Sequence, residues 1–181
     1  MYPSFIKTKF KIQSESVDAY KGEFLWRGSS IHKFKIKRLY TLFSPEQLRI
    51  LSPEQICLSE AYNSFVPHFD VDASAKLNIY IGPGKGITRF WKIKPKAKPV
   101  MSKYYSENLA DHHKVPNQYD PKDLEEISSF TAEKDDAYLL NISKIHSVDI
   151  PEGETRSFIQ FSWFSIPFNL VAKKFEKYGF I

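Results

Sequence analysis

Runs in which apolar and polar residues alternate dominate the chain from residue 65 onward, and this period of two predicts β-strands. The expected strands are 65–72, 76–81, 87–93, 137–142, 144–150 and 155–164. Turn-forming residues at 82–86 and 151–154 join two pairs of these strands into hairpins. Short strands joined by tight turns, with helices at the flanks, predict a mainly β sandwich or barrel.

Helices are expected before and after this β region. The sequence Ser-Pro-Glu-Gln occurs at 44–47 and again at 52–55, and each copy has the serine, proline and glutamine of a helix N-terminus. Two short helices are therefore predicted, with Cys57 as a small buried residue in the second. Pro167 is expected to open a C-terminal helix that Gly179 ends.

A length of 181 residues favours a single domain. We expect strands and supporting helices over 1–64, a β core over 65–164 and the last helix over 165–181. Residues 94–136 show little periodicity beyond a helical turn or two. A long segment of this kind inside a compact domain is often a lid or binding loop, so substrate is expected to enter beside it.

Composition gives no sign of a membrane or secreted protein. No stretch approaches the roughly 20 apolar residues that span a bilayer, and the N-terminus has no apolar signal core. Cys57 is the only cysteine, so no internal disulfide can form. These features predict a cytoplasmic protein that does not interact with membranes.

Net charge is +5, and lysines are concentrated at 33–38 and 92–98. One interpretation is a surface that binds a polyanion such as nucleic acid. The other is the solvated face of half-buried strands. Because the lysines alternate with apolar residues in both runs, the pattern favours the second interpretation.

A candidate metal site begins with His68 and Asp70. Side chains two apart on a strand point to the same face, so this imidazole and carboxylate can reach one ion. Asp72 shares that face and is the alternative carboxylate. His146 is chosen as the third ligand because it lies in an expected strand, unlike the histidines within 94–136. Two imidazoles and one carboxylate leave three positions open, which suits Fe(II) that must also bind an oxidant.

Arg156 follows His146 across the turn predicted at 151–154, so the two are expected on neighbouring antiparallel strands. A guanidinium can hold a carboxylate through two parallel hydrogen bonds. The apolar residues that follow Arg156 favour its burial, and a buried arginine needs an anion. The alternative is an ordinary exposed strand arginine.

Six pieces of the sequence, in this order, resemble the Fe(II)/2-oxoglutarate-dependent dioxygenases, in particular their small prolyl-hydroxylase-like and phage-type members. The pieces are 66–70, 77–81, 86–90, 136–140, 145–148 and 155–157. The resemblance implies a double-stranded β-helix, which is an eight-stranded, cupin-like jelly roll with iron at its open end. Phe158 departs from the pattern, because many members have serine two residues after the arginine.

The resemblance also implies roles for the site residues. The implied Fe(II) ligands are His68, Asp70 and His146. Arg156 would pair with the distal carboxylate of 2-oxoglutarate, and Asn78 and Tyr80 would add contacts to this co-substrate. The implied activity is hydroxylation of an unidentified small molecule, peptide or nucleic acid, with release of succinate and CO₂.

Three alternatives are weighed against this activity. A cupin-like oxygenase would use the same metal without 2-oxoglutarate, although Asp70 argues against a halogenase, which normally lacks the carboxylate ligand. A non-catalytic jelly-roll module could bind a polyanion, but the presence of all four key side chains argues against a decayed site. Structural zinc usually takes four protein ligands and often cysteine, of which there is one.

Overall fold

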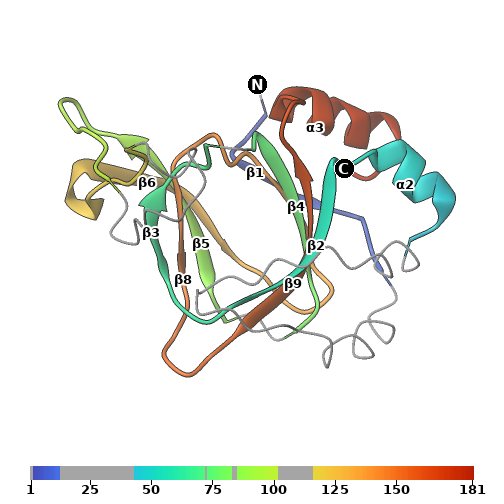
Figure 1. Ribbon diagram of the computed structural model, residues 1–181, viewed down its shortest axis with the longest axis horizontal. Helices are drawn as coiled ribbons and strands as arrows, with labels where there is room; N and C mark the ends of the chain where they lie inside the picture. Colours follow the sequence, from blue (N-terminus) through green and yellow to red (C-terminus); the bar gives the residue numbers. More distant parts are fainter. Residues whose placement is uncertain (1, 13–42, 72, 83–84, 102–115) are drawn as a thin grey trace.

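The computed structural model in Figure 1 describes residues 2–12, 43–71, 73–82, 85–101 and 116–181. The described strands are β1 (Phe5–Thr8), β2 (Gln55–Ala61), β3 (Phe65–His68), β4 (Ala75–Tyr80), β5 (Ile87–Ile93), β6 (Leu124–Thr131), β7 (Ala137–Leu140), β8 (His146–Asp149) and β9 (Arg156–Trp163). The described helices are α2 (Pro45–Leu51), the 3₁₀ helix η4 (Pro121–Asp123) and α3 (Phe168–Lys177). None of these helices is long and apolar enough to cross a membrane.

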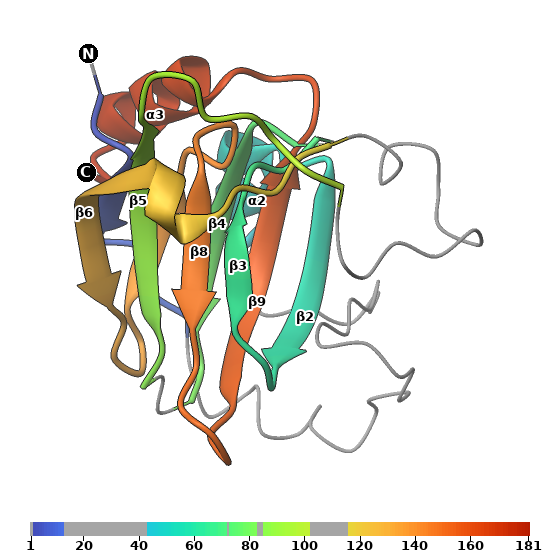
Figure 2. The same ribbon diagram turned by 90° about the vertical axis from the view of Figure 1, so that its left-hand side faces the viewer.

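The strands form two antiparallel sheets that face each other. The larger has the order β1-β7-β4-β9-β2 and the smaller has the order β3-β8-β5-β6. From β2 onward, each strand passes to the other sheet except at the β5–β6 hairpin. The hairpins predicted at 82–86 and 151–154 are therefore wrong, because each of these turns leads from one sheet to the other. His146 on β8 and Arg156 on β9 lie in different sheets, not on neighbouring strands. Figure 2 shows the four strands of the small sheet side by side. This arrangement is a jelly roll, so the fold class expected from the sequence is confirmed.

The large sheet is buried on both faces, and β9 shows why. All eight residues of β9 are buried. Its odd-numbered residues from Ile159 to Trp163 pack in a core with helices α2 and α3, which cover the outer face of the sheet (Figure 1). The even-numbered side chains point toward the small sheet, because successive strand residues face opposite ways. Polar residues at these even positions therefore lie inside the protein.

Helix α2 begins as the sequence predicts. The Ser44 hydroxyl accepts a hydrogen bond from the Gln47 backbone N–H, and the Gln47 side chain accepts one from the Ser44 N–H. The second predicted helix is wrong: Ser52 instead ends α2, with φ of 42°, and β2 follows. The physical reason is pairing, because all seven residues of β2 are in register with β9. Cys57 is buried as expected, but in this strand.

Strand β6 also differs from the expectation of an irregular segment over 94–136. It pairs with β5, and a bulge between Phe90 and Trp91 shifts the register. Only Leu124 and Phe130 are buried in β6, so its sequence shows little alternation. The predicted lid falls partly on residues 102–115, which lie outside the described residues and leave that prediction untested. The lysine run at 33–38 lies outside them as well.

Packing of α3 on the large sheet gives the first testable prediction. Phe175 is fully buried, and its ring lies against those of Trp163 and Phe180, with centroids 6.1 and 5.6 Å away. Phe175→Ala should lower the free energy of unfolding by about 3 to 5 kcal/mol, because it removes a buried ring and leaves a cavity. Urea denaturation measures this loss.

Leu170 supplies the matched control on the same helix, since it is 55% exposed. Leu170→Ala should change the free energy of unfolding by about 0.5 kcal/mol or less. Equal effects of the two substitutions would mean that α3 does not pack on the sheet as described.

Candidate functional site

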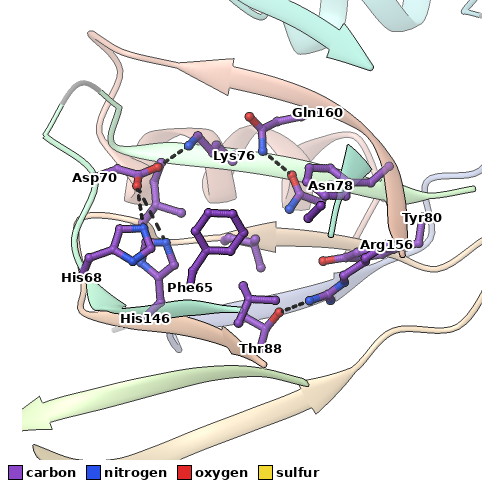
Figure 3. A pocket seen from close by; sticks show the side chains of 15 residues that line it. Phe65, His68, Asp70, Lys76, Asn78, Tyr80, Thr88, His146, Arg156 and Gln160 are labelled. Atoms are coloured by element: carbon purple, nitrogen blue, oxygen red, sulfur yellow. Dashed lines mark hydrogen bonds and ion pairs between the residues drawn. The ribbon is translucent and has the colours of Figure 1, made fainter. Parts of the chain in front are cut away.

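A cavity opens between the two sheets, with a volume of about 90 Å³, which is room for several water molecules. Its walls are the inward-facing side chains of both sheets (Figure 3). The polar residues that line it are His68, Asp70, Lys76, Asn78, Thr88, His146, Arg156 and Gln160. Figure 3 shows them in two groups, with the histidines at one end and Arg156 at the other.

The structure brings His68, Asp70 and His146 together, as the sequence predicts. Strand β3 pairs with β8 so that the two histidines are directly opposite each other, with ring centroids 4.5 Å apart. Asp70 lies two residues beyond β3. Its Oδ1 is 3.3 Å from Nε2 of His68 and 3.9 Å from Nε2 of His146. One potential ligand atom from each residue lies within 4.8 Å of the others. Asp72, the alternative carboxylate, is outside the described residues.

Backbone carbonyl groups set the orientation of both imidazoles. Nδ1 of His68 is 2.8 Å from the Val66 carbonyl oxygen, and Nδ1 of His146 is 3.0 Å from that of Lys144. A carbonyl oxygen can only accept, so each Nδ1 carries the proton and donates. Each Nε2 is then on the side of its ring that faces Asp70. Metal-binding histidines are held in this way by a partner on their second nitrogen.

The two kinds of ligand are also in the protonation states that metal binding requires. Burial works to raise the pKa of Asp70, but Lys76 and the two histidines outweigh it and hold that pKa well below its usual range. Burial, together with the neighbouring His68, lowers the pKa of His146 to about 4 against the opposing effect of Asp70. At neutral pH the site therefore contains a carboxylate and a neutral His146.

Lys76 is a site residue that our sequence analysis missed. It is 9% exposed, and its ammonium group forms an ion pair with Oδ2 of Asp70. The sequence did contain a signal, because Lys76 is two residues before Asn78 and four before Tyr80, which places all three on one strand face. All three side chains line the cavity.

Arg156 is buried at the other end, with 2% of its surface exposed. Its Nη1 donates to Oγ1 of Thr88 at 2.8 Å, and its guanidinium carbon lies 4.4 Å from the centre of the Tyr80 ring. Its Nε and Nη2 are buried and have no hydrogen-bond partner among the described residues. Buried donors without partners are costly, so this end of the cavity is suited to an anion with acceptor oxygens.

Gly86 and Thr88 both support Arg156. A Cβ on Gly86 would lie 3.3 Å from Cδ of Arg156 and 3.0 Å from the Asp149 carbonyl oxygen, so a larger residue would displace its neighbours. The hydroxyl of Thr88 fixes one end of the guanidinium. The Gly-x-Thr sequence therefore has a physical reason here, although sequence reasoning assigned neither residue to the site.

An amide pair lies on the wall formed by β4 and β9. Nε2 of Gln160 donates to Oδ1 of Asn78 at 2.9 Å, across the register that pairs the two residues. Oε1 of Gln160 is buried and unpartnered within the described part of the chain. Asn78 and Gln160 both line the cavity, and sequence reasoning did not find Gln160.

No protein-family model and no curated protein matches the sequence, whereas solved structures do match the fold. The epimerase SnoN in complex with Fe³⁺, alpha ketoglutarate and nogalamycin RO aligns with a TM-score of 0.52 and 10% identity, over 88% of this chain and 78% of that one. The chain has the fold of 2-oxoglutarate–Fe(II) oxygenases. An oxidoreductase of that family from Burkholderia pseudomallei aligns with a TM-score of 0.50 and 8% identity, over 83% and 76% of the two chains.

HygX from Streptomyces hygroscopicus, solved with nickel, 2-oxoglutarate and hygromycin B, aligns with a TM-score of 0.50 and 13% identity. The alignment covers 88% of this chain and 82% of HygX. At identities this low, what is shared is the jelly roll.

The low pKa of His146 predicts how stability depends on pH in metal-free protein. The unfolded chain binds a proton at the ordinary pKa of 6.5, whereas the folded chain does so only near 4. This contribution to stability is therefore present above about pH 6.5 and is lost as the pH falls toward 4. Between about pH 7 and pH 5, the free energy of unfolding should fall by about 2 kcal/mol.

Urea denaturation with a chelator present measures this loss, and His146→Asn provides the control, because asparagine does not titrate. The variant should lose markedly less stability over the same range. Equal losses in the two proteins would contradict a buried, neutral His146.

Proposed function

We propose that the protein is an Fe(II)- and 2-oxoglutarate-dependent oxygenase that hydroxylates its substrate and releases succinate and CO₂. The observation that carries the proposal is that one cavity contains two complementary groups. A His₂Asp set lies at one end, and at the other lies Arg156, which has two buried donors without partners among the described residues. Iron would bind the His₂Asp set, and a dicarboxylic co-substrate would bind both the iron and Arg156.

The His₂Asp group fits a divalent metal of the iron type. Neutral imidazole nitrogens and a carboxylate oxygen are the ligands of the non-haem Fe(II) oxygenases, and three ligands leave positions open for co-substrate and oxygen. Structural zinc normally uses four protein ligands, whereas the metal-binding group found among the described residues has three. This supports an open catalytic centre.

The Arg156 end fits a carboxylate. Nε and Nη2 of Arg156 have no partner in the part of the chain that the structure describes. Together they match two carboxylate oxygens bidentately, and the buried position strengthens such a pair. Thr88 and Tyr80 hold the guanidinium from two sides, so little freedom would be lost on binding. Asn78 and Gln160 lie along the wall of the same cavity and add polar contacts.

Bound Fe(II) and 2-oxoglutarate would supply the chemistry by activating O₂ to oxidise the substrate. The chain's own residues would position these partners and exclude water from them. His68, Asp70 and His146 would hold the metal, while Arg156 would orient the co-substrate toward it. Apolar lining residues, among them Phe65, Ile142, Val148 and Phe158, limit the water that can enter.

The proposed substrate is a small molecule, a peptide or a nucleic acid, as predicted from the sequence. A cytoplasmic location is part of the proposal, and the single cysteine, which excludes an internal disulfide, supports it.

The proposal predicts an optical signature. Titration of the Fe(II)-loaded protein with 2-oxoglutarate under anaerobic conditions should produce a weak metal-to-ligand charge-transfer band in the visible spectrum. Asp70→Ala should abolish the band, because it removes the carboxylate ligand. If the wild-type protein binds iron but shows no band, a metal oxygenase that does not use 2-oxoglutarate replaces this proposal. If the wild-type protein binds no iron, the alternative of a non-catalytic binding module replaces this proposal.

Arg156 provides a separate test of the co-substrate end. Arg156→Ala should weaken 2-oxoglutarate binding about 100-fold, or about 3 kcal/mol, because two charge-assisted hydrogen bonds are lost. Iron affinity should change little, since Arg156 lies at the other end of the cavity (Figure 3). Isothermal titration of the metal-loaded protein measures both quantities.

Arg89 is the matched control for this experiment. It is paired with Glu126 and Asp149 and does not line the cavity. Arg89→Ala should leave the affinity for 2-oxoglutarate within about twofold of wild type. If Arg156→Ala behaves in the same way, Arg156 does not bind the co-substrate.

A further inference from the structure

Lys76 is a buried lysine beside the candidate metal ligands, and the proposed function gives it no role. It lies on β4 with its side chain in the cavity, and only 9% of the residue is exposed. Its ammonium group forms an ion pair with Asp70, as Figure 3 shows. If Asp70 binds a metal as proposed, a cation in contact with its carboxylate would repel the metal ion.

The two oxygens of Asp70 have different partners. Oδ2 accepts the hydrogen bond from Lys76. Oδ1 faces the imidazoles, 3.3 Å from Nε2 of His68 and 3.9 Å from Nε2 of His146. The same three groups that would share a metal therefore meet around Oδ1, while Lys76 occupies the other oxygen.

We propose that Lys76 is a positioning residue that restricts Asp70 to binding the metal through Oδ1 alone. The inference rests on the proposed function and adds a specific determinant to it. A carboxylate can bind a metal ion through one oxygen or through both. With Oδ2 held by Lys76, Asp70 takes one coordination position instead of two.

The number of open positions gives this restriction its importance. Two imidazoles and a single carboxylate oxygen leave three positions on an octahedral metal. A 2-oxo acid that chelated the metal would take two of these positions, and the third would remain for O₂. If Asp70 bound through both oxygens, the chelate would fill the last open positions. Lys76 would therefore lower the affinity of the site for the metal but keep one coordination position open for O₂.

The experiment compares full-length wild type with Lys76→Met, which keeps similar volume without charge or donor, and Lys76→Arg, which keeps both. Co(II) is added to chelator-treated protein, and its affinity and visible absorption spectrum are recorded. 2-Oxoglutarate is then titrated into the Co(II)-loaded proteins. Thermal melts with Co(II) show whether each variant is folded.

In Lys76→Met, Co(II) should bind at least as tightly as in wild type, because a repelling cation is gone. Its spectrum should change as Asp70 becomes bidentate, and 2-oxoglutarate should bind about tenfold more weakly or worse. Lys76→Arg should restore the wild-type spectrum and bind 2-oxoglutarate within about threefold of wild type. A residue that merely supports the fold would instead lower the Co(II) affinity when replaced by methionine. That result, or a wild-type spectrum and affinity in Lys76→Met, overturns the proposal.

A measurement on the wild-type protein tests the same point without relying on a variant. Mn(II) bound to the protein should retain three water ligands, which pulsed electron paramagnetic resonance in isotopically labelled water can count. Two water ligands would mean that Asp70 is bidentate and the proposal is wrong. Failure of the wild type to bind 2-oxoglutarate would overturn the proposed function, whereas the water count would still decide the role of Lys76.

Discussion

The burial of β9 on both faces is the constraint on which the rest of the structure depends. Its outer face carries Phe161 and Trp163, which pack in the core with the two helices, and its inner face carries Arg156 and Gln160. Strands β2 and β4 pair with its two edges. A strand enclosed in this way cannot slip by one residue, because a slip would exchange apolar and polar faces. The Arg156 end of the candidate site therefore takes its geometry from the packing of the large sheet.

Charge in the cavity is arranged so that few groups are left uncompensated. Asp70 has Lys76 beside it, and burial keeps His146 neutral. The exception is Arg156, because two of its donors lack a partner within the described chain. Buried polar groups are nearly always satisfied in folded proteins, so two unsatisfied donors on one buried guanidinium favour the binding of an anion. The Arg156 end of the cavity has the unsatisfied charged donors, and it therefore gives the clearest indication that the cavity binds an anion.

The two sheets contribute differently to the site. The small sheet supplies His68 and His146 as neighbours across one strand pair, so their separation depends on a single register. The large sheet supplies Lys76 and Arg156, which come from adjacent antiparallel strands. A ligand that reached both ends of the cavity would contact both sheets. Its binding would therefore favour one fixed distance between the sheets and so stabilise the fold.

Sequence alone determined the features that depend on neighbours along the chain. Alternation of apolar and polar residues identified most strands, and the capping sequence correctly placed the start of α2. The His-x-Asp spacing and the later histidine identified three residues that the structure brings together. The alternation and the capping sequence follow from the pitch of a strand or helix, which is the same in every protein. Asp70, by contrast, lies beyond the end of β3, which the sequence predicted to continue to residue 72.

Only the tertiary structure decided the features that depend on pairing between distant segments. The second capping sequence competed with seven residues of pairing to β9, and the sheet prevailed. Arg156 and Thr88 are 68 residues apart in sequence, and nothing local to either one shows that they form a hydrogen bond. The contact between Lys76 and Asp70 forms where the chain crosses from the small sheet to the large one between β3 and β4. Local pattern gives the residue types available for the site, whereas long-range packing selects which of them meet, because burial and charge compensation are properties of the assembled sheets.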